Sequence, residues 1–130
     1  MKKKQDFGRM TFDTFRQMAS DKSLSIYEKV GFPDSYRKNK ERSIFEDIHK
    51  KTDLDRKKIK VLDLGCGCSD LVHYLIDNSE ELEQELYLID SKEMLDLINN
   101  RKTAKKLALK FPDEEFLKQY QSFFDVVIVY

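Results

Sequence analysis

Apolar residues recur every three or four positions along the first fifty residues, and this spacing predicts amphipathic helices. In the first helix Phe12, Phe15 and Met18 share one face. The second helix ends before Gly31, where a left-handed residue is favoured, and Pro33 prevents its continuation. We expect helices over residues 10–20, 23–30 and 41–51, with a polar connector over residues 32–40.

From residue 58 onwards, short apolar runs alternate with helical stretches. IKVLDL, ELYLID and FDVVIVY are apolar runs of strand length, and a weaker alternation of apolar residues indicates one further short strand. We expect strands over residues 59–64, 85–90, 106–110 and 124–130, and helices over residues 69–78, 91–100 and 113–122. Because the connections are short and each strand is followed by a helix, the pattern predicts a parallel sheet with right-handed crossovers.

The two patterns divide the chain into an N-terminal helical arm, residues 1–57, and an α/β unit, residues 58–130. A length of 130 residues suits one compact domain. Hydrophobic residues make up 40% of the chain, and 24 Lys and Arg balance 24 Asp and Glu, which indicates a soluble globular protein.

Several classes of protein are disfavoured by the composition. No run of eighteen apolar residues indicates a membrane span, and the first residues lack the apolar segment of a signal peptide, so we expect a cytoplasmic protein. Residues 37–60 are basic, but no aromatic or glycine-rich RNA-binding signature accompanies them, and we predict no nucleic-acid partner. Two cysteines one residue apart cannot form a disulfide framework.

The stretch VLDLGCGCSD, residues 61–70, places a strand, a glycine turn and a helix start in succession. Gly65 and Gly67 allow a sharp turn that exposes backbone N–H groups to a ligand. A P-loop is excluded because no GK[ST] follows. A dinucleotide fingerprint fits poorly, because Asp70 stands at its third glycine and residues 61–91 contain no Lys or Arg to offset a pyrophosphate. A ligand with cationic groups fits better.

These residues resemble the first motif of class I S-adenosylmethionine-dependent methyltransferases, an apolar strand followed by D/E-x-G-x-G-x-G. LYLIDSKEML resembles the second motif of that family, in which an acidic residue ends the second strand, and FDVVIVY resembles its fourth strand. The resemblance covers about residues 58–130. It implies an α/β fold with a Rossmann-like parallel sheet flanked by helices. The arm resembles one found on some bacterial methyltransferases.

The resemblance implies S-adenosylmethionine as the cofactor and assigns residues of the first motif to it. Asp63 would support the turn near the methionine part. Gly65, Cys66 and Gly67 would line the carboxypropyl arm. One departure is Ser69, which stands at the third glycine of the family motif and narrows the turn.

The later motifs supply the remaining assignments. Asp90 would accept hydrogen bonds from both ribose hydroxyls, with Ser91 beside the adenosine. Asp113 would lie near the adenine amino group. The backbone at Val129 and Tyr130 would lie beside the cofactor, where the fourth strand of the family ends.

The chain stops at Tyr130, before the further strands of the family's sheet, whose order is 3-2-1-4-5-7-6. We therefore expect a partial sheet of order 3-2-1-4 with an apolar edge at residues 124–130, and a truncated form in which cofactor binding survives while transfer is impaired. Association of two copies through this edge strand is a further expectation.

Other chemistry-bearing residues have plainer interpretations. Cys66, Cys68 and His73 fall short of the four ligands that zinc prefers, and we predict no metal site. His73 suits either a general base or a helix-surface position. Phe12 and Phe15, with the nearby methionine, suit either a lid over a substrate or packing of the arm.

The predicted function is S-adenosylmethionine-dependent methyl transfer to a small-molecule acceptor. No catalytic residue is assigned, because positioning supplies much of the rate of an in-line displacement at an activated methyl group. Two alternatives stay open. One is a non-catalytic Rossmann-like interaction module, and the other is a nucleotide-dependent oxidoreductase, which the acidic turn disfavours.

Overall fold

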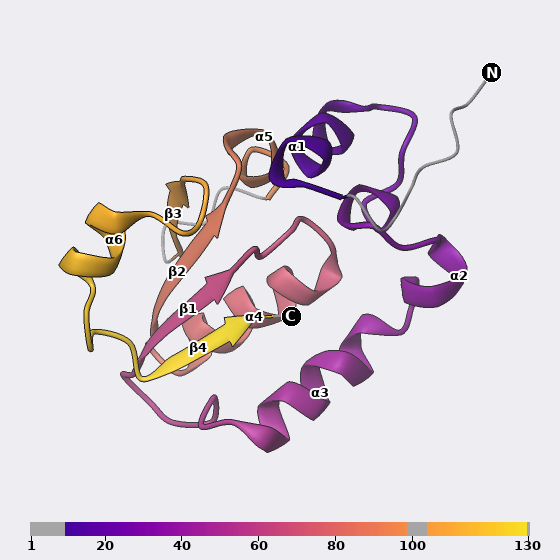
Figure 1. The fold of residues 1–130 in the computed structure, drawn as a ribbon. Coiled ribbons are helices and arrows are strands. Elements are labelled where there is room, and N and C mark those ends of the chain that lie inside the picture. Colours follow the sequence, from indigo (N-terminus) through magenta and orange to yellow (C-terminus); the bar gives the residue numbers. More distant parts are fainter. Residues whose placement is uncertain (1–9, 99–103, 130) are drawn as a thin grey trace.

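The computed structural model describes residues 10–98 and 104–129 of the chain, and its centre is a four-stranded sheet (Figure 1). All neighbouring strands are parallel, in the order β3-β2-β1-β4, so the predicted α/β class and strand order 3-2-1-4 are confirmed. The strands are β1 (Lys60–Leu64), β2 (Glu85–Asp90), β3 (Ala104–Ala108) and β4 (Val126–Val129). The helices that follow β1, β2 and β3 are α4 (Asp70–Glu81), α5 (Lys92–Leu95) and α6 (Glu114–Gln119).

The third strand begins and ends two residues earlier than the sequence pattern predicts. Ala108 pairs with Asp90, which is the last residue of β2, so β2 offers no further residues for pairing. Leu109 still donates its N–H to the backbone oxygen of Asp90, at 3.2 Å, but lies beyond the strand. The partner strand, rather than the alternation of leucines, therefore sets the extent of β3.

The arm precedes the sheet and consists of α1 (Phe12–Ser20), the 3-10 turn η2 (Glu28–Val30), α2 (Asp34–Arg37) and α3 (Glu41–Lys51). The third predicted helix is confirmed over its full range. The polar connector contains the one-turn helix α2, which the sequence pattern did not indicate. Figure 1 shows the arm bending around the sheet, with α1 beside α5 and α3 along α4.

The helix expected over residues 23–30 is reduced to the short turn η2 because local side chains compete for the backbone. Asp21 accepts hydrogen bonds from the backbone N–H and the hydroxyl of Ser23, at 2.9 and 2.6 Å. Ser25 and Glu28 then form a reciprocal capping box, at 3.0 and 3.1 Å. Gly31 ends the turn in the left-handed region, with φ 97°, as expected.

A buried lysine holds the arm together. The ammonium group of Lys29 donates to the backbone oxygens of Met18, Ala19 and Asp21, at 3.3, 3.0 and 2.6 Å. Positive charge is favoured at a helix C-terminus, where backbone oxygens lack partners within the helix. Lys29 thus closes the end of α1 and fixes the position of the loop that follows it.

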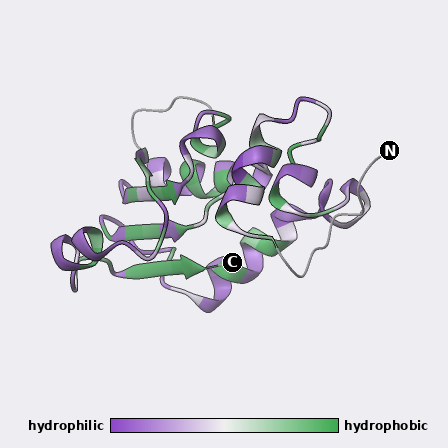
Figure 2. Ribbon diagram, turned by 45° about the horizontal axis from the view of Figure 1, so that its top comes forward, coloured by the Kyte–Doolittle hydropathy of each residue, from purple (hydrophilic) through white to green (hydrophobic). Residues whose placement is uncertain are grey.

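The two faces of the sheet are covered by different helices. On one face α1, α3, α4 and α5 pack over an aliphatic core. On the other face α6 packs over an aromatic cluster. Figure 2 shows the strands as largely hydrophobic, with hydrophilic residues on the outer turns of the helices. Within the described ranges, no helix has the length and apolar character needed to cross a bilayer.

Candidate functional site

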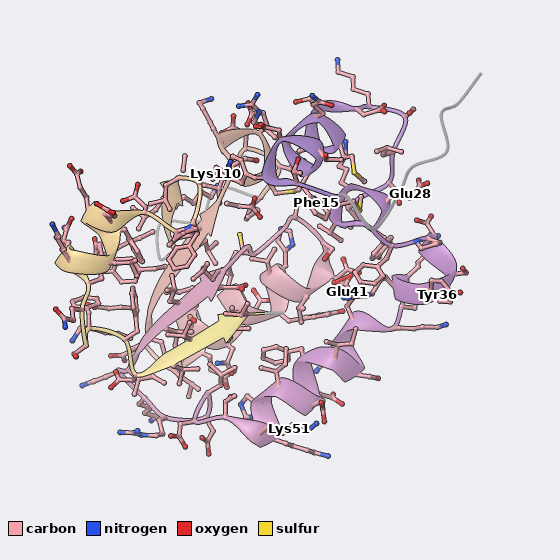
Figure 3. All side chains as sticks on the ribbon, in the orientation of Figure 1. Phe15, Glu28, Tyr36, Glu41, Lys51 and Lys110 are labelled. Atoms are coloured by element: carbon pink, nitrogen blue, oxygen red, sulfur yellow. The ribbon has the colours of Figure 1, made fainter. Side chains whose placement is uncertain are left out.

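A cavity of about 290 Å³ lies beyond the carboxyl ends of β1 and β2, under the arm. In parallel α/β sheets this edge is where ligands bind. The sheet side of the cavity is lined by Asp63, Gly65, Cys66, Gly67, Ser69 and Asp90. The arm side is lined by Phe12, Phe15, Val30, Phe32, Arg37 and Phe45. Figure 3 shows Phe15 between α1 and the loop that follows β1.

The two glycines of the turn have different roles. Both are left-handed, with φ 72° at Gly65 and 67° at Gly67, which favours glycine at each position. A Cβ atom at Gly65 would meet no atom within 4 Å, so this side of the turn is open. A Cβ atom at Gly67 would lie 2.7 Å from Cγ1 of Val30. Gly67 therefore lets the arm approach the turn, which sequence reasoning did not indicate.

Asp63 places a buried carboxyl group on the cavity wall. In the described part of the chain, no group donates a hydrogen bond to this carboxyl and no basic side chain pairs with it. Burial, and secondarily the nearby charge of Asp90, raise the pKa of Asp63 to about 7. A ligand that brings a cation or a hydrogen-bond donor would remove this cost of desolvation.

Asp90 lies on the same face of the sheet as Asp63, because Asp63 is paired with Leu88, two residues before Asp90. Its carboxylate accepts the backbone N–H of Gly67 at 2.9 Å and that of Ser91 at 2.8 Å. Burial raises the pKa of Asp90, while these two hydrogen bonds lower it in part. A carboxylate has about four acceptor positions, so Asp90 retains capacity for a ligand's hydroxyl groups.

The cysteines contribute neutral thiols. Cys66 lines the cavity, and burial together with Asp63 and Asp90 raises the pKa of its thiol well above the usual range. Cys68 is buried under the arm, with Sγ 3.8 Å from the backbone oxygen of Ile26, and burial raises its pKa to about 11. Among the residues that the structure describes, no group of three or more His, Cys, Asp or Glu is arranged for a metal ion.

The cavity thus brings together Asp63, Gly65, Cys66, Gly67 and Asp90, five of the nine residues assigned to the cofactor or placed beside it. Ser91 and Asp113 do not line it. Each caps a helix instead: the Ser91 hydroxyl accepts the N–H of Met94 at 3.1 Å, and Asp113 accepts that of Phe116 at 2.8 Å. Tyr130 lies outside the described residues.

The sequence left two roles open for the arm residues, a lid or packing, and two for His73, a general base or a helix-surface position. Phe12 and Phe15 line the cavity, whereas Met18, with 6% of its surface exposed, lies in the core. His73 does not line the cavity, and its Nδ1 lies 2.9 Å from the backbone oxygen of Ser69, the N-cap residue of α4. A substrate-facing role therefore suits the first two phenylalanines and not the histidine.

Glu41 is a residue of the site that sequence reasoning missed. Its buried carboxylate accepts the Ser69 hydroxyl at 2.6 Å and the Leu71 N–H at 3.1 Å, so it caps α4 from the arm (Figure 3). Ser69 occupies the N-cap position but makes no side-chain cap bond itself. No local signal identifies this contact, because Glu41 is 28 residues from Ser69 along the chain.

The arm makes a second polar contact with the start of α4. The Tyr27 hydroxyl donates to Oδ2 of Asp70 at 2.5 Å, and this hydrogen bond, with burial, raises the pKa of Tyr27 to about 12. Glu41 and Tyr27 therefore hold the helix start that follows the glycine turn. The turn is positioned from both sides, by the strand that precedes it and by the arm.

Comparison with known proteins finds a distant structural likeness and no family. No protein-family model and no curated protein matches the chain. A solved structure of the plantazolicin methyltransferase BpumL in complex with SAH aligns with 89% of this chain at 18% identity and a TM-score of 0.38. The chain spans 47% of that protein, about half its length.

The fold is Rossmann-like. This assignment rests on the parallel order β3-β2-β1-β4, with helices on both faces of the sheet. The position of the cavity at the carboxyl ends of β1 and β2 is the one at which this class of sheet binds ligands.

Proposed function

We propose that this chain binds S-adenosylmethionine in the cavity and takes part in methyl transfer to a small-molecule acceptor. The observation that carries the proposal is the buried carboxyl of Asp63, which faces the cavity without a donor among the described residues. A second carboxylate, that of Asp90, stands at the end of the neighbouring strand.

The ligand's charges complement these two carboxyl groups. S-adenosylmethionine carries an ammonium and a sulfonium, and a cation near Asp63 would offset the desolvation of its carboxylate. The vicinal ribose hydroxyls supply two donors for the free acceptor positions of Asp90. Gly65 leaves open space for the ligand beside the turn. A pyrophosphate, by contrast, would be repelled by the same carboxylates.

When bound, S-adenosylmethionine supplies a methyl group that its sulfonium already activates. The residues of this chain then orient and enclose the reactants, which supplies much of the rate of such a displacement. Asp63 and Asp90 hold the donor, while Phe12 and Phe15 cover the cavity and exclude water. The Cys66 thiol, whose pKa is raised, stays neutral beside the methyl donor.

Calorimetric titration of the protein with S-adenosylmethionine, S-adenosylhomocysteine and NAD tests the proposal. We expect the first two to bind and NAD not to bind. Asp90→Ala should weaken binding by about tenfold or more, because a hydrogen bond to a charged group contributes about 1.5–3 kcal/mol.

Asp96→Ala is the matched control, because Asp96 is exposed at the C-terminal end of α5, where it pairs with Lys92. Asp90→Asn keeps one acceptor oxygen for the Gly67 N–H and so preserves this contact of the turn. Comparing it with Asp90→Ala shows whether a loss of binding in the alanine variant follows from disruption of the fold. Equal affinity of the wild-type protein and Asp90→Ala for S-adenosylmethionine would reject the ribose assignment, and preferential binding of NAD would reject the cofactor.

A further inference from the structure

The cavity has two chemically different sides. The side formed by the glycine turn carries the carboxyl groups of Asp63 and Asp90. The side formed by the arm is apolar and aromatic, with four phenylalanine rings from three separate segments of the arm: Phe12, Phe15, Phe32 and Phe45. Phe12 and Phe15 share one face of α1, but Phe32 and Phe45 come from later segments of the chain. Only folding of the arm brings them together.

The rings on the arm side are incompletely buried. Phe12, Phe15 and Phe45 are half-buried, and Phe32 is exposed over 39% of its surface. By contrast, Met18 on the same helix as Phe15 is packed into the core. Burial of apolar surface is favourable, so an aromatic ring that enters the cavity and covers these side chains gains favourable contact area.

Arg37 is the basic residue among those that line the described cavity. Its side chain is 10% exposed, and its guanidinium lies 3.9 Å from the centroid of the Phe32 ring and 4.0 Å from Oε1 of Glu41. These contacts hold the guanidinium plane against the aromatic wall. The guanidinium therefore stands on the arm side, beside the Phe32 ring and the Glu41 carboxylate, and opposite the carboxyl groups of the turn.

The volume of the cavity limits what enters it. At about 290 Å³ it is close to the lower end of the range for small-molecule sites, roughly 300–1,000 Å³. An acceptor that enters the arm side is therefore a small molecule. A polymer backbone does not fit inside such a space.

From these observations we propose that the arm side of the cavity binds the methyl acceptor and selects a small aromatic molecule with an anionic substituent. The ring lies against Phe15, Phe32 and Phe45, and Arg37 pairs with the anionic group. This orientation keeps the anion away from Asp63. The inference rests on the proposed function, since it assumes that the turn side holds S-adenosylmethionine.

Calorimetric titration of the protein saturated with S-adenosylhomocysteine tests this selectivity. The probes are benzoate, benzyl alcohol and cyclohexanecarboxylate, which separate the ring from the charge. We expect benzoate to bind about fivefold more tightly than either of the others, because each lacks one of the two recognised features. Equal affinity for benzoate and cyclohexanecarboxylate, or no binding of benzoate, would overturn the proposal.

Two variants with matched controls locate the site. Phe32→Leu keeps an apolar side chain but removes the ring, and we expect it to weaken benzoate binding about fivefold. Tyr36→Ala is its control, because Tyr36 is 67% exposed on the outer side of α2 and does not line the cavity (Figure 3). Arg37→Gln should remove the preference for benzoate over benzyl alcohol, and Arg42→Gln, on the exposed side of α3, should retain it.

The titration with S-adenosylhomocysteine alone separates this inference from the proposed function. If S-adenosylhomocysteine does not bind, the proposed function fails. If it binds and benzoate does not, only the acceptor class is overturned. The acceptor class would also be overturned if Phe32→Leu and Tyr36→Ala weakened benzoate binding equally. The probe would then not lie against the aromatic rings of the arm.

Discussion

The two faces of the sheet use different side chains and serve different purposes. The face that packs against α1, α3, α4 and α5 has an aliphatic core and carries Asp63 and Asp90 at its carboxyl edge. The face that packs against α6 has a cluster of aromatic rings with centroids 4.8–6.3 Å apart: Tyr87, Phe111, Phe116, Tyr120, Phe123 and Phe124. Successive residues of one strand, such as Leu62 and Asp63, belong to opposite faces.

The comparison shows which face of the sheet can carry functional groups. The α6 face buries rings in edge and stacked contacts, and the buried acidic residues of the described part, Asp63 and Glu41, lie elsewhere. The opposite face keeps buried carboxyl groups and a cavity, which costs stability because desolvated carboxylates are unfavourable. We therefore expect substitutions on the α6 face to change stability alone, and substitutions at the cavity to change both pH dependence and ligand binding.

The largest expected effect is the pH dependence that Asp63 gives to stability. Its pKa is about 7 in the folded protein, against 3.8 ordinarily, so between these values the folded protein keeps a proton that the unfolded chain releases. The free energy of unfolding therefore falls as pH rises from about 4 to about 7, by about 4 kcal/mol in total, and loses nothing more from this group at higher pH. Asp63→Asn should abolish most of this decline.

Urea unfolding of wild type and Asp63→Asn at several pH values measures the effect. Asp96→Asn, at the exposed C-terminal end of α5, should retain the wild-type decline. A wild-type stability that rises steadily across this pH window would contradict the raised pKa of Asp63. A cationic ligand that pairs with Asp63 should in turn bind more tightly as pH rises through 7.

The next largest effect is expected on the α6 face. Phe116 is 6% exposed and its ring lies near those of Phe111, Tyr120 and Phe124. Phe116→Ala removes these contacts and should lower the free energy of unfolding by about 3–4 kcal/mol, measured by urea denaturation. Its affinity for S-adenosylmethionine, measured on the folded fraction, should equal that of the wild type.

Leu117→Ala provides the control for this substitution, because Leu117 is 48% exposed on the same helix. We expect it to cost about 0.5 kcal/mol or less. A selective loss of ligand affinity in Phe116→Ala would break the division of roles between the two faces, because it would connect the aromatic cluster to the cavity.

The smallest effect is expected at the exposed part of β4. Val129 is 75% exposed, so Val129→Thr should change the free energy of unfolding by about 0.5 kcal/mol or less, whereas Ile128→Val, at a buried neighbour, should cost about 1 kcal/mol. In the described sheet β4 is an edge strand that pairs with β1. Association of two copies through it stays a prediction, which sedimentation at tens of micromolar checks: a monomer would reject it.

Much of the α/β unit could be predicted from the sequence because its signals are local. The run ELYLID forms β2 over the predicted residues 85–90, and the turn at Gly65 and Gly67 follows β1 as expected. Such patterns depend on side-chain periodicity and on the left-handed conformations that glycine allows. The prediction for the helix after β2 was less accurate. A helix was expected over residues 91–100, but α5 ends at Leu95, and residues 99 and 100 lie outside the described part.

The arm and its contacts could not be predicted in the same way. Its first and third helices followed from periodicity, but the cap that Glu41 provides to α4 joins residues 28 and 30 positions apart. The close approach of Val30 to Gly67 likewise depends on how the arm folds over the sheet. Local propensity carries no information about such pairs.

By itself, the sequence determined the alternation of strands and helices, the glycine turn and the acidic residues near the ends of β1 and β2, because each depends on a few neighbouring residues. Only the tertiary structure decided which of them face a common cavity. It placed Asp63 near Asp90, with no hydrogen-bond donor to the Asp63 carboxyl among the described residues. It also brought the arm against Gly67, so that this glycine is needed for the approach of the arm as well as for the turn. It also separated Phe15, on the cavity wall, from Met18, in the core. The physical reason is that burial and electrostatic environment depend on segments brought together by packing across the whole chain.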